Sequence, residues 1–126
     1  MMSEGPFVTQ ILSDDVVEIA VSLTDVVYSN TIDLNLGEYF SLAYKATSDG
    51  NVKLKLEWQE SHDGTNFVVP VGFSDIVSAL ADENWHIAKL EPVCMPYGRI
   101  KITGLGAPSA NDASTTLQLK IGKLLL

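Results

Sequence analysis

The sequence predicts an all-β domain, an antiparallel two-sheet β-sandwich or jelly roll with at most one short helix. Three observations predict this fold class. Short runs of alternating apolar and polar residues recur along the chain, clusters of turn-forming residues separate them, and the length of 126 residues suits a single domain. Such a chain has room for about eight to ten short strands, and the pattern leaves a closed barrel open as the alternative.

The alternation is clearest in a predicted hairpin over residues 40–58. Apolar side chains fall on every second position of both of its strands, over 40–46 and 52–58. Residues 48–51 read Ser-Asp-Gly-Asn, and because Asp, Gly and Asn tolerate positive φ, we predict a tight turn between the strands. The apolar faces, with Trp58 among them, are expected to cover the core.

Further strands are predicted over 7–12, 16–23, 32–36, 67–69, 85–90, 98–103 and 115–122, with a loop over 104–112. The first of these are rich in β-branched residues, although residues 14–20 can also be read as the start of a helix. Pro70 ends the strand before it because proline cannot donate a ladder hydrogen bond. Residues 74–81 are the best helix candidate, since Ser74 can cap a helical turn there.

The composition restricts the partners. Acidic residues outnumber basic ones by 16 to 8, and the formal net charge is −8. Phosphate backbones require Lys- and Arg-rich surfaces, so we expect no nucleic-acid partner, and a basic protein partner suits the charge better. No apolar stretch approaches the roughly 18 residues of a membrane span, and residues 1–7 do not resemble a signal peptide, so we expect no membrane partner.

No catalytic motif stands out in the chain. His62 and His86 lack metal-binding spacing, and Glu57 and Glu60 form a carboxylate pair by composition only. Cys94 is the single cysteine and has no basic residue close in sequence, so we predict a buried structural thiol. We therefore predict a protein that is not an enzyme and has no catalytic residues.

Acidic turns recur at 48–51, 63–66 and 111–112. Their side-chain oxygens are the kind of ligand that calcium takes, but Asp and Asn are also ordinary turn formers, and we predict neither a metal nor a cofactor. The aromatics Trp58, Trp85, Tyr44 and Tyr97 are candidates for a sugar-stacking platform, and since Trp58 is expected in the core, Trp85 and Tyr97 are the ones that would be exposed.

Residues 56–122 resemble a known family in the order of their turns and strands. The resemblance covers about half of the chain and rests on Glu57-Trp58-Gln59-Glu60-Ser61-His62-Asp63-Gly64-Thr65-Asn66-Phe67, Asn84-Trp85-His86, Leu90-Glu91-Pro92, Tyr97 to Gly104, and Ser114 to Leu117. The order is similar to that of small β-sandwich structural proteins of tailed bacteriophages, such as head decoration proteins. The matching positions are structural, so the resemblance transfers no functional residues.

The resemblance implies a non-enzymatic virion protein that decorates or stabilises a capsid. It implies a homo-oligomer, most often a trimer, which binds the major capsid protein after assembly in the host cytoplasm. We expect one domain over 1–126, with an N-terminal arm over 1–10 and a contact tail over 123–126. Leu124, Leu125 and Leu126 are the predicted interaction residues of the tail. The alternative is a carbohydrate- or receptor-binding module of a phage tail, which would use the exposed aromatics.

Overall fold

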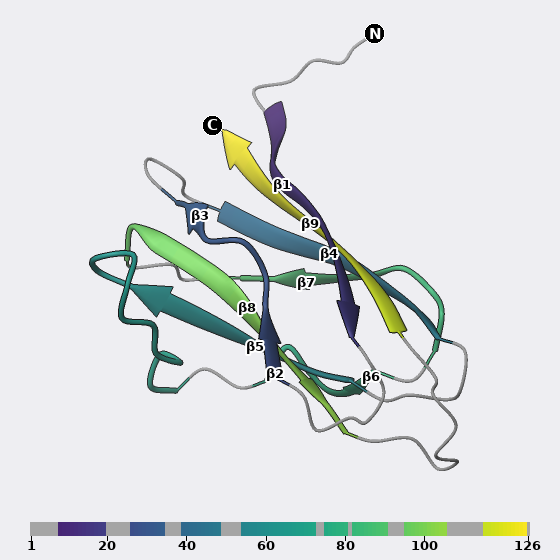
Figure 1. Cartoon of the computed structure of the whole chain (residues 1–126). Coiled ribbons are helices and arrows are strands. Elements are labelled where there is room, and N and C mark those ends of the chain that lie inside the picture. Colours follow the sequence, from purple (N-terminus) through teal and green to yellow (C-terminus); the bar gives the residue numbers. More distant parts are fainter. Residues whose placement is uncertain are drawn as a thin grey trace, which may run out of the picture.

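The computed structural model describes residues 8–19, 26–34, 39–48, 54–72, 75–80, 82–90, 95–105 and 115–125. These residues form strands and no helix: β1 Val8–Ile19, β2 Val26–Tyr28, β3 Ile32–Asp33, β4 Tyr39–Ser48, β5 Leu54–Ser61, β6 Val77–Leu80, β7 His86–Lys89, β8 Tyr97–Gly104 and β9 Thr115–Leu125. Two antiparallel sheets result (Figure 1), which confirms the predicted all-β sandwich. Within the described residues, no helix is long and apolar enough to cross a membrane.

The strand order is that of a jelly roll. Sheet A has the order β1-β9-β4-β7, and sheet B has the order β2-β8-β5-β6, with β3 paired to the same strand β8 as β2. When β2 and β3 are counted as one interrupted strand, the chain crosses between the sheets at every connection except that from β5 to β6. The closed-barrel alternative is wrong, because the strands belong to two separate sheets with edges of their own.

The predicted hairpin over 40–58 is wrong in its pairing, although both of its strands exist. β4 lies between β9 and β7, and β5 lies between β8 and β6, so neither strand has an edge left for the other. An apolar face covers the core whether the next strand pairs beside it or crosses to the facing sheet. The alternation is therefore the same for a hairpin and for a crossing between sheets.

The helix predicted over 74–81 is also wrong. Residues 77–80 form β6, which pairs with β5 at the edge of sheet B, and the backbone N–H of Ile76 donates a 2.9 Å hydrogen bond to the carbonyl of Leu56. The apolar spacing suited either structure, and pairing with the sheet edge overrode the weak helix propensity. Of the strand predicted over 67–69, only Val68 pairs, as a single bridge to Glu60.

The remaining strand predictions hold with changed limits. The first two merge into β1, whose register shifts between Ile11 and Ser13. Because β1 continues through residues 14–19, the helical alternative for 14–20 is wrong over its described residues. β3 covers a part of the predicted 32–36. β7, β8 and β9 confirm the last three predicted strands, and β9 continues to Leu125. The predicted loop loses Gly104 to β8, and its residues 106–112 lie outside the described part.

The core lies between the facing sides of the two sheets. Leu42 of β4 lies opposite Ile121 of β9, and Leu56 of β5 lies opposite Ile102 of β8, and all four side chains are fully buried or nearly so. Burying a side chain of this kind stabilises the fold by about 1.5–3 kcal/mol. Trp58 is fully buried in the same layer, which confirms its predicted place.

Trp58 closes one end of the core against a glycine. A Cβ atom at Gly98 of β8 would overlap the outer carbons of the indole ring and touch Leu34. The indole Nε1–H donates a 2.9 Å hydrogen bond to Oε2 of Glu60, which lies opposite Gly98 in the ladder. The fold thereby fixes Glu60 at the end of β5, where the candidate site begins.

Candidate functional site

Asp63 organises the turn that follows β5. Its Oδ1 accepts hydrogen bonds from the Ser61 hydroxyl at 2.9 Å and from the backbone N–H groups of Thr65 and Asn66, both at 2.8 Å. Its Oδ2 accepts a 2.7 Å hydrogen bond from the side-chain amide of Asn66. These donors, led by the backbone N–H groups of Asn66 and Thr65, hold the pKa of the Asp63 carboxyl well below its usual range.

Gly64 and Tyr97, two of the residues on which the resemblance rests, lie close together at this turn. Gly64 has a φ of 80°, a left-handed conformation that favours glycine. The place that its Cβ would take lies 3.6 Å from the Tyr97 ring, so the ring covers the turn. Tyr97 is half-buried in this position and does not stand out as a platform.

Arg99 connects the loop that carries Phe67 to the outer face of sheet B. Its guanidinium carbon lies 3.8 Å from the ring centroid of Tyr28 and 4.1 Å from that of Phe67, and its Nε donates a 2.8 Å hydrogen bond to Oε1 of Gln59. A planar guanidinium can stack between two rings and donate in its own plane at the same time. The aromatic residue of the turn motif is therefore structural here.

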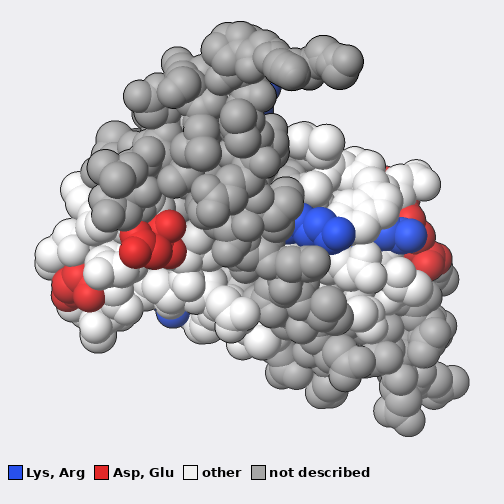
Figure 2. All heavy atoms as spheres, turned by 90° about the horizontal axis from the view of Figure 1, so that it is seen from above, with Lys and Arg blue, Asp and Glu red and all other residues white. Residues whose placement is uncertain are grey.

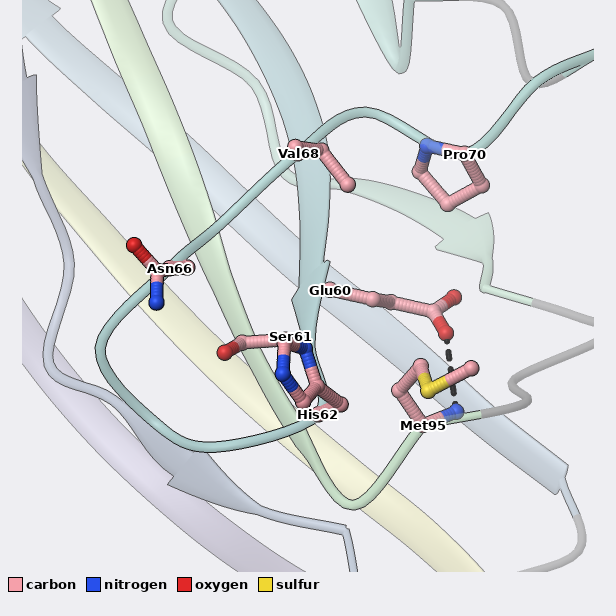
Figure 3. Close-up of a pocket in the computed structure, with 7 residues that line it drawn as sticks. All are labelled: Glu60, Ser61, His62, Asn66, Val68, Pro70 and Met95. Atoms are coloured by element: carbon pink, nitrogen blue, oxygen red, sulfur yellow. Dashed lines mark hydrogen bonds between the residues drawn. The ribbon is translucent and has the colours of Figure 1, made fainter.

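A hollow of about 470 Å³ lies between this loop and the segment before β8 (Figure 3). Its lining consists of Glu60, Ser61, His62, Asn66, Val68, Pro70 and Met95. Figure 3 shows Val68 and Pro70 on the loop, Met95 on the other side, and Glu60 reaching between them. Val68 is 66% exposed and Met95 is 44% exposed, so the rim presents carbon to solvent.

The polar groups of the hollow serve the structure. Glu60 is buried, and its Oε1 accepts a 3.1 Å hydrogen bond from the backbone N–H of Met95 while its Oε2 accepts from Trp58. Glu57, in the opposite phase of β5, forms an ion pair with Lys55 at 3.8 Å. The two glutamates that composition made available as a pair therefore do not converge.

The sequence interpretation missed the apolar rim. Residues 68–71 read Val-Val-Pro-Val, and Val68 and Pro70 of this run line the hollow. A signal was present, because a proline inside a run of valines keeps the run out of a regular ladder. A soluble protein rarely groups exposed apolar side chains without using them as a contact surface.

Trp85 lies elsewhere, directly before β7 on the outer face of sheet A. Its side chain is 46% exposed, and the ammonium groups of Lys45 and Lys120 lie 6.0 Å and 5.8 Å from a ring centroid of the indole. Ile87, two positions further along the same face, is 77% exposed. Because Trp85 belongs to sheet A and Tyr97 to sheet B, the fold does not bring the two predicted aromatics together.

His86 anchors the turn that presents Trp85. Its ring stacks on Tyr44 with the ring centroids 5.3 Å apart, and its Nε2 lies 2.7 Å from Oδ1 of Asp82. This hydrogen bond, followed by one from the backbone N–H of Asn84, lowers the pKa of Asp82. Burial, followed by the charge of Asp82, raises the pKa of Tyr44. His86 therefore has a structural role at the edge of sheet A, where it contacts Tyr44 and Asp82.

The predicted tail is part of a sheet in this chain. The backbone of Leu124 pairs with Thr9 of β1 and with Tyr39 of β4, and Leu125 pairs with Val8. Leu126 lies outside the described residues.

The prediction for Cys94 and part of the prediction for the acidic turns fall outside the described residues. Cys94 itself, the turn at 111–112 and residues 49–51 of the turn at 48–51 are not described. The acidic turn at 63–66 is described, and its aspartate accepts from its own loop. Within the described part of the chain, no three His, Cys, Asp or Glu side chains group together as a metal site.

The fold therefore defines a two-sheet jelly-roll sandwich with an apolar hollow at one end and an exposed aromatic on one sheet face. No protein-family model matches the chain, and no curated protein matches it. A function has to be inferred from these surfaces.

Proposed function

We propose that this protein is a non-enzymatic virion structural protein, a decoration or stabilising protein that binds a capsid surface as a homo-oligomer. The observation that carries the proposal is the apolar rim of the hollow, where Val68 and Met95 are exposed on its two sides with Pro70 beside them. Burying such a rim against another protein is favourable by about 25 cal/mol for each Å² of apolar surface. Jelly-roll sandwiches also recur among viral capsid domains, which is a fold-level analogy in its favour.

The polar chemistry around the hollow agrees with a contact surface. The Glu60 carboxylate holds Trp58 and Met95 in place, and the Asp63 carboxylate holds its own turn. These groups make the wall rigid, and a rigid wall loses little conformational entropy when a partner covers it.

Sedimentation tests the proposal. DNA-free heads from the phage or prophage whose genome encodes this chain are mixed with the purified protein and pelleted, and the free protein is sized by sedimentation velocity. The wild type is expected to form an oligomer and to pellet with the heads. Val68→Asp is expected to weaken one of these associations roughly tenfold or more, since a buried valine contributes at least about 1.5 kcal/mol.

Leu105→Asp is the matched control, because Leu105 is an exposed apolar residue that does not line the hollow. It should leave both associations unchanged. A wild-type protein that stays monomeric at all concentrations and fails to pellet with heads would contradict the proposed function.

The second candidate is a carbohydrate- or receptor-binding module of a phage tail. The exposed Trp85 favours it, because an indole face can stack on a sugar ring and jelly rolls also occur among lectins. A glycan array separates the candidates: binding that Trp85→Ala abolishes, with no association with heads, would favour the tail module.

A further inference from the structure

The half of the outer face of sheet A that β4 and β7 form has a local charge opposite to that of the whole chain. Its described side chains include Lys45 and Lys89 and no acidic residue, whereas on the other half the register places Asp14 of β1 opposite Lys120 and Glu18 opposite Thr116. The chain as a whole has 16 acidic and 8 basic residues. Figure 2, viewed from the side of β1 and β9, shows the larger basic groups on its right-hand half and acidic groups at the left and at the far right edge.

An apolar pair lies among these lysines. Ala43 of β4 pairs with Ile87 on one side and with Lys120 on the other, so Ile87 and Lys120 flank it across the sheet. Continuing the same register places position 85 beside Lys45, and the indole of Trp85 lies within reach of both ammonium groups. The β4–β7 half of the face thus offers two exposed apolar side chains, Trp85 and Ile87, flanked by Lys45 and Lys89.

We propose that this face is the binding site for an acidic segment of another protein, one that carries an apolar side chain between carboxylates. The apolar side chain packs on Trp85 and Ile87, and the carboxylates lie beside Lys45 and Lys89. This inference rests on the proposed role of the chain in assembly, and it names the chemistry of a partner at a surface distinct from the hollow.

The composition of the face decides between possible occupants. A glycan would use the indole, but it would gain little from Ile87, an aliphatic side chain that is 77% exposed. An acidic protein segment uses both, because tryptophan and its apolar neighbours act as anchors while charges at the rim steer the approach.

The test uses a synthetic peptide in which Glu-Ser-Leu-Ser-Glu is repeated, titrated into the 15N-labelled full chain. The signal of the Trp85 indole N–H is assigned with Trp85→Phe and compared with that of the buried Trp58. The acidic peptide should shift the Trp85 signal and leave that of Trp58 in place, and the effect should weaken with added salt. Control peptides carry Lys in place of Glu, or Ser in place of Leu, and should bind more weakly.

Charge reversal supplies the matched variants. Lys89→Glu alone, and together with Lys45→Glu, should weaken peptide binding roughly tenfold or more, because like charges across a contact are strongly unfavourable. Lys101→Glu, on the outer face of sheet B, should bind as the wild type does. Lys89 is exposed, so the single variant is expected to fold and keeps the test decisive if the double variant does not.

Three outcomes would overturn the inference. The first is equal binding of the acidic and basic peptides, or none of the acidic peptide at millimolar concentration. The second is a response of Trp85 to a heparin oligosaccharide and not to the peptide, which would assign the face to an anionic glycan. The third is a loss of self-association on Lys89→Glu, which would assign it to a second copy. Heads that bind wild type and Lys89→Glu alike would leave the proposed function intact while removing its link to this face.

Discussion

Gly98 is a residue at which the core leaves little room for a side chain. The Trp58 indole occupies the space that a side chain at position 98 would need, and Trp58 is also held by its hydrogen bond to Glu60. We expect Gly98→Ala to destabilise the protein by about 1–3 kcal/mol, because overpacking forces the ring or the backbone to move. Urea denaturation followed by circular dichroism measures the loss.

A double-mutant cycle identifies the cause. Trp58→Phe removes the outer carbons that the new Cβ would meet, so Gly98→Ala should cost much less in the Trp58→Phe background than in the wild type. Equal costs in both backgrounds would mean that the indole is not the obstacle.

At the scale of residues, the sequence was enough to place Trp58 but not Gly98. The indole could be assigned to the core because Trp58 shares its phase with Leu54 and Leu56. The need for a glycine at position 98 depends on which strand lies opposite β5, and that pairing is a tertiary fact. The same limit applies to Val68 and Met95, which only the fold brings to one hollow.

The turn after β5 is an element that we expect to be sensitive to acid. Hydrogen bonds in the fold lower the pKa of Asp63 from its ordinary value of 3.8. The turn is therefore expected to add stability that is fully present above about pH 4 and is lost as the pH falls below that value toward the lowered pKa of the folded state. Urea midpoints at several pH values between 7 and 2.5 measure this loss.

Asp63→Asn gives the comparison. The amide keeps an acceptor for the backbone N–H groups of Thr65 and Asn66 but has no charge to titrate, so it should lower the urea midpoint at neutral pH and flatten the loss in acid. The wild type and the variant should approach each other as the pH falls. Parallel pH curves would show that Asp63 does not carry the acid sensitivity.

At the scale of elements, the existence of a strand was more predictable than the strand it pairs with. β4 and β5 were visible as alternating runs, yet in the structure they belong to different sheets. The sequence of β6 predicts a helix because its apolar spacing fits both periods over so short a segment, and only pairing with the edge of β5 decides between them. Turn chemistry was the better guide at 61–66, where hydrogen bonds between residues close in sequence define the turn.

For the whole molecule, β9 is the strand on which sheet A depends. It lies between β1 and β4, and its pairing with β1 joins the beginning of the described chain to its end. Contacts so distant in sequence must close a very large loop, so we infer that sheet A forms late and slowly in folding. The jelly-roll order itself could not be read from strand patterns, because it consists of such distant pairings.

Because β9 lies between β1 and β4, deleting the C-terminal leucines would weaken sheet A as well as any contact with a neighbouring subunit. The deletion of residues 124–126 removes the pairs Leu124–Thr9, Leu124–Tyr39 and Leu125–Val8. Backbone hydrogen bonds contribute about 0.5–1.5 kcal/mol each, so the truncated chain is expected to lose on the order of 1–3 kcal/mol of stability even as a monomer. A change in its oligomeric state would then not separate a lost contact from a weakened sheet.

Replacing Leu124 and Leu125 by threonine makes the separation. Threonine keeps the backbone of β9 and suits a strand, while it removes apolar surface. If the tail contacts a neighbouring subunit through these side chains, the substituted chain sediments as a smaller species while its urea midpoint falls less than that of the truncated chain. A truncated chain that unfolds at the same urea concentration as the full chain would contradict the central place of β9 in the stability of sheet A.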